Sequence, residues 1–96
     1  MSVFVVQHQH SAEGCPAGDA QMGPMLLQHL SDESAAKFGI KVRGDAVLNG
    51  LHHLFLILEA ESEGKVQEFM TPFAQMGSVE VLDANSCTTV VGRGHC

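Results

Sequence analysis

The sequence predicts an α+β fold in which an antiparallel sheet carries two helices on one face. Strand-like and helix-like segments follow one another in the order β-α-β-β-α-β, and an Asn49-Gly50 pair joins two apolar runs near the middle. This order is typical of a sheet whose helices cover one side. A chain of 96 residues has room for one hydrophobic core. We therefore expect a single domain over residues 1–96.

The first half of the chain is predicted from its apolar pattern and its turn residues. Residues 2–10 begin with a β-branched, apolar run, which is typical of a strand. Residues 11–23 contain three glycines and one proline, so they form a long loop. Residues 24–38 have helical spacing, with a break near Ser31 where a cap can start a second short helix. Gly39 is placed to end that helix.

The Asn49-Gly50 pair favours a type I′ turn, so residues 40–48 and 51–60 are expected to form a hairpin. We expect one face of this hairpin to pack on the helices; it gathers Ile40, Val42, Ala46, Leu48, Leu51, His53, Phe55 and Ile57. The other face gathers Lys41, Arg43, Asp45, Val47, His52, Leu54, Leu56 and Leu58. This second face is too apolar for a solvated sheet, which predicts that another copy of the chain covers it.

The second half adds a helix and two strands. Residues 61–76 place apolar side chains at helical spacing, and Pro72 should kink the last turn. Residues 78–83 alternate as a strand, and residues 88–91 are expected to form a further short strand. The elements together predict a ferredoxin-like βαββαβ arrangement with an extra C-terminal strand.

The element order, the chain length and the apolar second sheet face resemble the dimeric α+β barrel superfamily, which includes muconolactone-isomerase-like and antibiotic-monooxygenase-like domains. The resemblance covers most of the chain and implies a homodimer in which two sheets pack face to face. It rests on the pattern of elements and carries over no catalytic residue. Isomerases, oxygenases, haem-handling proteins and binding proteins share this architecture, so it does not define the function.

Composition excludes some classes of partner. The formal charge is −6, with only five Lys and Arg residues, which argues against nucleic acid. The apolar stretch near the N-terminus is short and follows no basic segment, so it predicts a strand and neither a signal peptide nor a membrane span. Three cysteines without an export signal point to a cytoplasmic protein with reduced thiols.

The candidate site combines histidines and cysteines from both ends of the chain. His8 and His10 share one face of the first strand, because alternate side chains of a strand point the same way. Cys15 follows on the loop, and the chain ends in His95 and Cys96. If the first strand lies between the third and the fourth, a hairpin after residue 83 returns the last strand to the end that carries His8 and His10. These five residues then form one metal site, in which His8, His10 and Cys15 are also the candidate catalytic residues.

Ligand chemistry narrows the choice of metal. Imidazole and thiolate suit Zn, Cu or Fe, whereas Mg and Ca prefer carboxylates. The chain has no CxxC or HExxH spacing, so a standard structural zinc module is not indicated. A second set, His29, His52, His53 and Cys87, is expected at the opposite end of the sheet. Its adjacent His52 and His53 point to opposite faces and do not suit one metal.

The leading hypothesis is a small cytoplasmic, homodimeric metal-binding protein or metal-dependent enzyme. Three alternatives stay open. A metal-free enzyme or small-molecule binder, isomerase-like or monooxygenase-like, would use His8 or His10 as acid or base. A reactive-thiol protein would use Cys15, which precedes a helical segment. An interaction domain would use its histidines only for structure.

Overall fold

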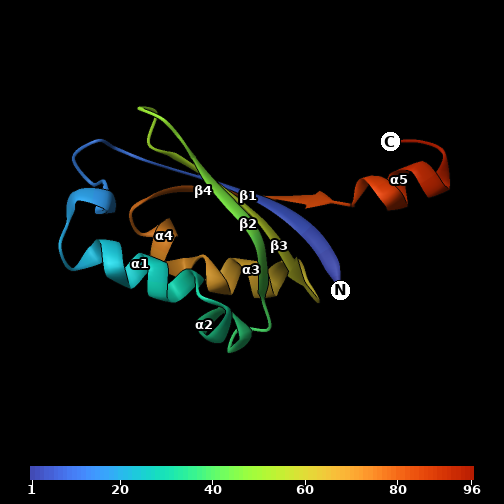
Figure 1. Cartoon of the computed structure of the whole chain (residues 1–96), viewed down its shortest axis with the longest axis horizontal. Helices are drawn as coiled ribbons and strands as arrows, with labels where there is room; N and C mark the ends of the chain where they lie inside the picture. Colours follow the sequence, from blue (N-terminus) through green and yellow to red (C-terminus); the bar gives the residue numbers. More distant parts are fainter.

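The computed structural model describes residues 1–96 and is built on one four-stranded antiparallel sheet (Figure 1). The strands are β1 (Ser2–His10), β2 (Lys41–Leu48), β3 (His53–Ala60) and β4 (Gly77–Ala84). Their order across the sheet is β2-β3-β1-β4, and every neighbouring pair is antiparallel. The predicted α+β class is confirmed, and so is the placement of the first strand between the third and the fourth.

Four α-helices lie along one side of the sheet, and a fifth extends away from it (Figure 1). The four are α1 (Met22–Leu30), α2 (Asp32–Ala36), α3 (Glu63–Phe69) and α4 (Thr71–Ala74). A 3-10 turn, η1 (Pro16–Gly18), interrupts the long loop after β1, and α5 (Cys87–Arg93) follows β4. None of these helices has the length and the apolar character that crossing a membrane requires.

Both predicted helix breaks are confirmed, and each has a local cause. The Ser31 hydroxyl accepts a hydrogen bond from the backbone N–H of Ser34 at 3.3 Å, which caps α2 just after α1 ends. Pro72 has no N–H to donate, and in a continuous helix its ring would crowd the carbonyl of Glu68, so α3 ends at Phe69 and α4 starts anew at Thr71. Gly39 follows the first helical segment with φ of 74°, a left-handed conformation that suits glycine.

The core lies between the sheet and the helices, and it corrects the predicted faces of the hairpin. Leu54, Leu56 and Leu58 of β3 are buried in the core, together with residues of α3 and α4. Ile57 lies on the other, open face of the sheet and is 46% exposed. Two predictions were therefore wrong: that Phe55 and Ile57 pack on the helices, and that a second copy of the chain covers Leu54, Leu56 and Leu58. Both faces of β3 carry large apolar side chains, so the pattern alone does not determine which face the helices cover.

The turn between β2 and β3 is longer than predicted. Leu48 pairs with His53, so a four-residue loop over 49–52 joins the strands in place of the expected two residues. A type I′ turn needs a positive φ at both central residues, but of Asn49 and Gly50 only Gly50 has one, at 77°. The extra length leaves His52 in the loop, where its own φ is 51°.

The segment predicted to be a C-terminal strand forms a helix instead, so the tail lies away from the candidate site. The Ser86 hydroxyl accepts a hydrogen bond from the backbone N–H of Thr89 at 3.2 Å, and Gly94 ends α5 with φ of 81°. These end signals outweigh the β-branched residues between them. Because β4 is antiparallel to β1 and ends at Ala84 beside Val3, α5 begins at the end of the sheet opposite His10.

Gly77 allows β4 to approach the end of β1. A Cβ atom at this position would lie 2.9 Å from the carbonyl carbon of Gln9 and closer still to its oxygen. We expect Gly77→Ala to lower the free energy of unfolding by about 1–3 kcal/mol, because backbone has to move to make room. Gly44→Ala on β2, where nothing lies within 4 Å of the added atom, is the matched control. Urea unfolding compares the two variants, and equal losses would contradict this reading of Gly77.

Candidate metal centre

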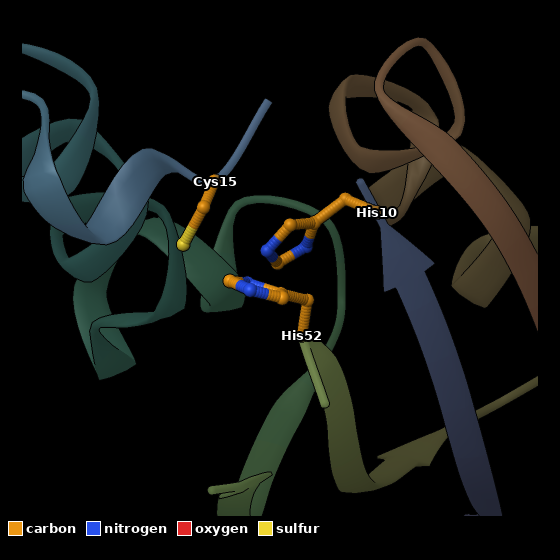
Figure 2. Close-up of side chains that lie close together, drawn as sticks. All are labelled: His10, Cys15 and His52. Carbon is orange, nitrogen blue, oxygen red and sulfur yellow. The ribbon is translucent and has the colours of Figure 1, made fainter. Parts of the chain in front are cut away.

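Three segments that are separate in the sequence meet at one end of the sheet. They are the end of β1, the loop before η1 and the turn between β2 and β3. His10, Cys15 and His52 each contribute one donor atom, and the three atoms lie within 4.8 Å of one another. Figure 2 shows the two imidazoles and the thiol directed toward a common space. Two nitrogens and one sulfur form a donor set that suits a transition metal.

Backbone hydrogen bonds position the three segments that carry these side chains. The N–H of His10 donates to the carbonyl oxygen of His52 at 3.2 Å, so the turn is tied to the end of β1. His52 has a left-handed backbone, with φ of 51°, a conformation that histidine adopts more readily than most residues other than glycine. Cys15 precedes η1, and its N–H donates to the carbonyl oxygen of Ala12 at 3.4 Å.

His10 is the one residue whose buried side-chain nitrogens or oxygens lack a hydrogen-bond partner. Both of its ring nitrogens are buried, and neither has a hydrogen-bond partner. Buried polar atoms normally have partners, because an unpaired one costs free energy. Burial lowers the pKa of His10, and the nearby imidazole of His52 lowers it further. A neutral ring with a free nitrogen is the form that binds a metal.

The spacing of the donor atoms is close to that of a metal site. Tetrahedral zinc bonds of about 2.0 Å to nitrogen and about 2.3 Å to sulfur place ligand atoms about 3.5 Å apart. The three donors lie within 4.8 Å of one another, so an ion would draw them together by about 1 Å. Cys15 and His52 lie on loops, where side-chain rotation can supply that movement.

His8 lies next to His10 but does not belong to the group of three donors, because its ring makes a hydrogen bond to the backbone. Its Nδ1 donates to the carbonyl oxygen of Ser78 at 2.9 Å, and the side chain is buried. Its ring centroid is 5.4 Å from that of His10, so the two imidazoles do share one face of β1, as predicted. Burial lowers the pKa of His8, and the hydrogen bond to Ser78 offsets part of that effect.

The two lowered histidine pKa values predict that metal-free protein loses stability on acidification. The unfolded chain takes up protons near the ordinary histidine pKa of about 6.5, whereas folded His8 and His10 take them up only at lower pH. Stability is therefore fully present above about pH 6.5 and falls as the pH drops through the folded pKa values. Urea unfolding across this range checks the effect. His8→Phe should reduce the dependence of the free energy of unfolding on pH, whereas His95→Phe in the exposed tail should leave that dependence unchanged.

The structure separates the five residues predicted to form the site. His10 and Cys15 belong to the group of three donors, and His8 lies next to it. His95 and Cys96 follow α5 at the opposite end of the sheet, so the predicted return of the tail was wrong for a single chain (Figure 1). The cause is the helix at 87–93, which replaces the expected strand.

The third donor, His52, was predicted at the wrong end of the sheet. β3 runs antiparallel to β1, and Gln9 pairs with His53, so the turn before β3 lies where β1 ends. The signal was present in the sequence, because the predicted strand order already implied this placement. His53 points to the open face and stacks on Phe55 with ring centroids 4.5 Å apart. Cys87 begins α5, which lies at the end of the sheet opposite His10, as predicted.

A cavity of about 460 Å³ opens beside the three donors. His8, His10, Cys15 and His52 line one part of it, and the remaining wall is mostly apolar side chains from α1, α4 and the β2–β3 turn. No Lys, Arg, Asp or Glu lines it. His29 of α1 also contributes, with its Nε2 donating to the carbonyl oxygen of Phe69 at 2.7 Å. A volume of this size suits a small organic molecule.

No protein-family model matches the chain, no curated protein is significantly similar to it, and no solved structure matches its fold significantly.

Proposed function

We propose that this protein binds one transition metal ion through His10, Cys15 and His52. The observation that carries the proposal is the convergence of these donors from three segments, with their ligand atoms within 4.8 Å. The unpaired, buried nitrogens of His10 support it, because a metal would satisfy one of them. Three protein ligands leave a fourth position for water or a substrate, which is the pattern of a catalytic or transport site.

The donor set favours Zn²⁺ or copper over iron. Imidazole and thiolate suit zinc, copper and iron, and no carboxylate belongs to the group. Non-haem iron oxygenase sites typically combine two histidines with a carboxylate, so iron fits this set less well. A metal-dependent enzyme is the finer form of the proposal.

Cobalt titration tests metal binding directly. Co²⁺ replaces Zn²⁺ in such sites and gives a thiolate-to-cobalt charge-transfer absorption. Reduced, metal-free protein should bind one Co²⁺ per chain with this absorption. Cys15→Ser should abolish the absorption, and Cys87→Ser, which changes an exposed cysteine of α5, should retain it. Identical spectra from the two variants would remove Cys15 from the site.

We also propose that the protein is a homodimer of the sheet-to-sheet kind, with a second copy on the open face. Ile57, Val5 and Leu82 form an apolar row across three adjacent strands of that face. Ile57 and Leu82 are 46% and 37% exposed. A two-fold axis along the strands would bring the β2 edge, where Arg43 pairs with Glu59 of its own chain at 3.3 Å, toward the β4 edge of the second copy.

Light scattering tests the dimer. Wild-type protein should be dimeric at micromolar concentration, and Ile57→Glu should shift it to monomer. Leu27→Glu, at an exposed position of α1 on the far side of the sheet, is the matched control and should remain dimeric. A monomeric wild type would contradict the dimer and leave metal binding unaffected. Three free cysteines support the cytoplasmic location that accompanies this proposal.

A metal-free binder or enzyme is the second candidate function, and the cavity favours it. His8 and His10 lie at the cavity, where either could act as an acid or base. The reactive-thiol alternative has less support. Cys15 precedes only the three-residue η1, and α1 starts at Met22, so the thiol does not head an α-helix.

A further inference from the structure

We propose that the cavity binds a small, uncharged, mostly apolar molecule through one hydroxyl group, placed beside the metal. The inference deepens the proposed function and rests on it for the position of the metal. It names the class of molecule that would occupy the fourth position of the site. Three features of the cavity wall lead to it: the tautomers of two histidines, the absence of charged side chains and the apolar lining.

The histidine tautomers determine which polar group the cavity accepts. His8 donates from Nδ1 to the carbonyl oxygen of Ser78, and His29 donates from Nε2 to the carbonyl oxygen of Phe69. A carbonyl oxygen only accepts, so each histidine must carry its proton on the bonded nitrogen. In the neutral ring the other nitrogen is an acceptor, Nε2 in His8 and Nδ1 in His29. Both rings line the cavity, so a ligand that donates a hydrogen bond is preferred.

The other residues of the cavity wall indicate the charge of the ligand and the chemical character of its main, apolar part. No Lys or Arg lines the cavity, so a carboxylate or phosphate would meet no cationic group there other than the metal, whose charge the Cys15 thiolate partly offsets. Met22, Met25 and Met76 lie in the wall with Leu26 and Phe73. Thioether sulfurs and a phenyl edge both make favourable contacts with aromatic rings. A hydroxylated aromatic molecule of phenol size therefore matches the wall and the volume of about 460 Å³.

The metal gives the hydroxyl group a second contact. His10, Cys15 and His52 also line the cavity, so a metal held by them has its fourth position at the cavity's polar end. A hydroxyl oxygen can bind the metal while its hydrogen is donated to the acceptor nitrogen of His8. This pairing uses the oxygen and the hydrogen of one group, and toluene, which lacks the hydroxyl, can supply neither.

The test compares p-cresol with toluene on Co²⁺-loaded protein. p-Cresol should change the cobalt absorption and bind at least about tenfold more tightly than toluene, because only p-cresol can bond to His8 and the metal. Benzoate serves as the anionic comparison. Tighter binding of toluene or benzoate than of p-cresol would overturn the proposal, as would an unchanged cobalt spectrum at saturating p-cresol.

Matched variants show whether the cavity holds the ligand. Leu26 lines the cavity, whereas the adjacent Leu27 is 72% exposed and does not. Leu26→Trp should weaken p-cresol binding at least about tenfold, and Leu27→Trp by less than about twofold. Ala17→Trp at the exposed part of the wall, with Ala20→Trp as its control, repeats the comparison without touching the core. Equal affinities within both pairs would overturn the proposal.

The two proposals fail in different ways. If Co²⁺ does not bind to wild-type protein, the metal centre is wrong, and with it this assignment of the fourth ligand. If Co²⁺ binds with its thiolate absorption but p-cresol has no effect, the metal centre stands and the ligand class is wrong.

Discussion

His52→Ala should weaken zinc binding by about 100-fold or more, which corresponds to about 2.7 kcal/mol or more of binding free energy. The imidazole of His52 is one of only three protein donors in the group, and the turn over 49–52 contains no other His, Cys, Asp or Glu to replace it. Loss of a residue that merely orients a ligand already costs about 10–100-fold in metal affinity. Loss of the ligand itself should cost at least as much. Competition with a chromophoric chelator measures the affinity.

The adjacent residue provides the control. His53→Ala removes an imidazole one position along the chain, but this side chain stacks on Phe55 on the open face of the sheet. We expect zinc affinity to change by less than about twofold. If the two variants bind zinc equally well, His52 is not a ligand, whatever its distance from His10.

Phe69→Ala should lower the free energy of unfolding by about 3–5 kcal/mol, a large part of the about 5–15 kcal/mol that stabilises a domain of this kind. Phe69 is fully buried at the end of α3. Its ring stacks on His29 with centroids 4.5 Å apart and meets the edge of Phe38 at 5.5 Å. Alanine would leave a cavity among α1, α3 and the segment after α2, and packed neighbours refill such space only partly.

Urea unfolding measures this loss, and Leu27→Ala is its control. Leu27 lies on α1 but is 72% exposed, so its truncation should change stability by less than about 0.5 kcal/mol. Similar losses for the two variants would mean that the aromatic cluster around His29 does not anchor the helices to each other.

Local signals in the sequence predicted much of the fold. The breaks at Ser31 and Pro72 depend on a cap and on a missing N–H, which act within a few residues, and both are confirmed. The faces of β3 depend on which side the helices cover, and that is a tertiary choice between two apolar faces. The β-branched residues of segment 88–91, taken alone, predict a strand. Ser86 and Gly94, at the ends of α5, were the signals that should have outweighed them.

The site was predicted only in part, because some of its residues are close in sequence and others meet only through the tertiary fold. His10 and Cys15 are close in sequence, so a strand and a short loop were enough to place them together. His52 reaches them through strand pairing, which has to be followed across the sheet. His95 and Cys96 were included because of a strand that does not form. A site residue that is distant in sequence is thus predicted correctly only if the strand or helix that carries it is predicted correctly.

X-ray absorption at the zinc edge of zinc-loaded protein tests the central claim most directly, because it reports the atoms bound to the metal. We expect one sulfur at about 2.3 Å and nitrogen ligands at about 2.0 Å, two of them with the outer-shell scattering of imidazole. The sulfur should disappear in Cys15→Ser and persist in Cys87→Ser. A first shell of oxygen and nitrogen alone in the wild-type protein would contradict a metal centre built from His10, Cys15 and His52.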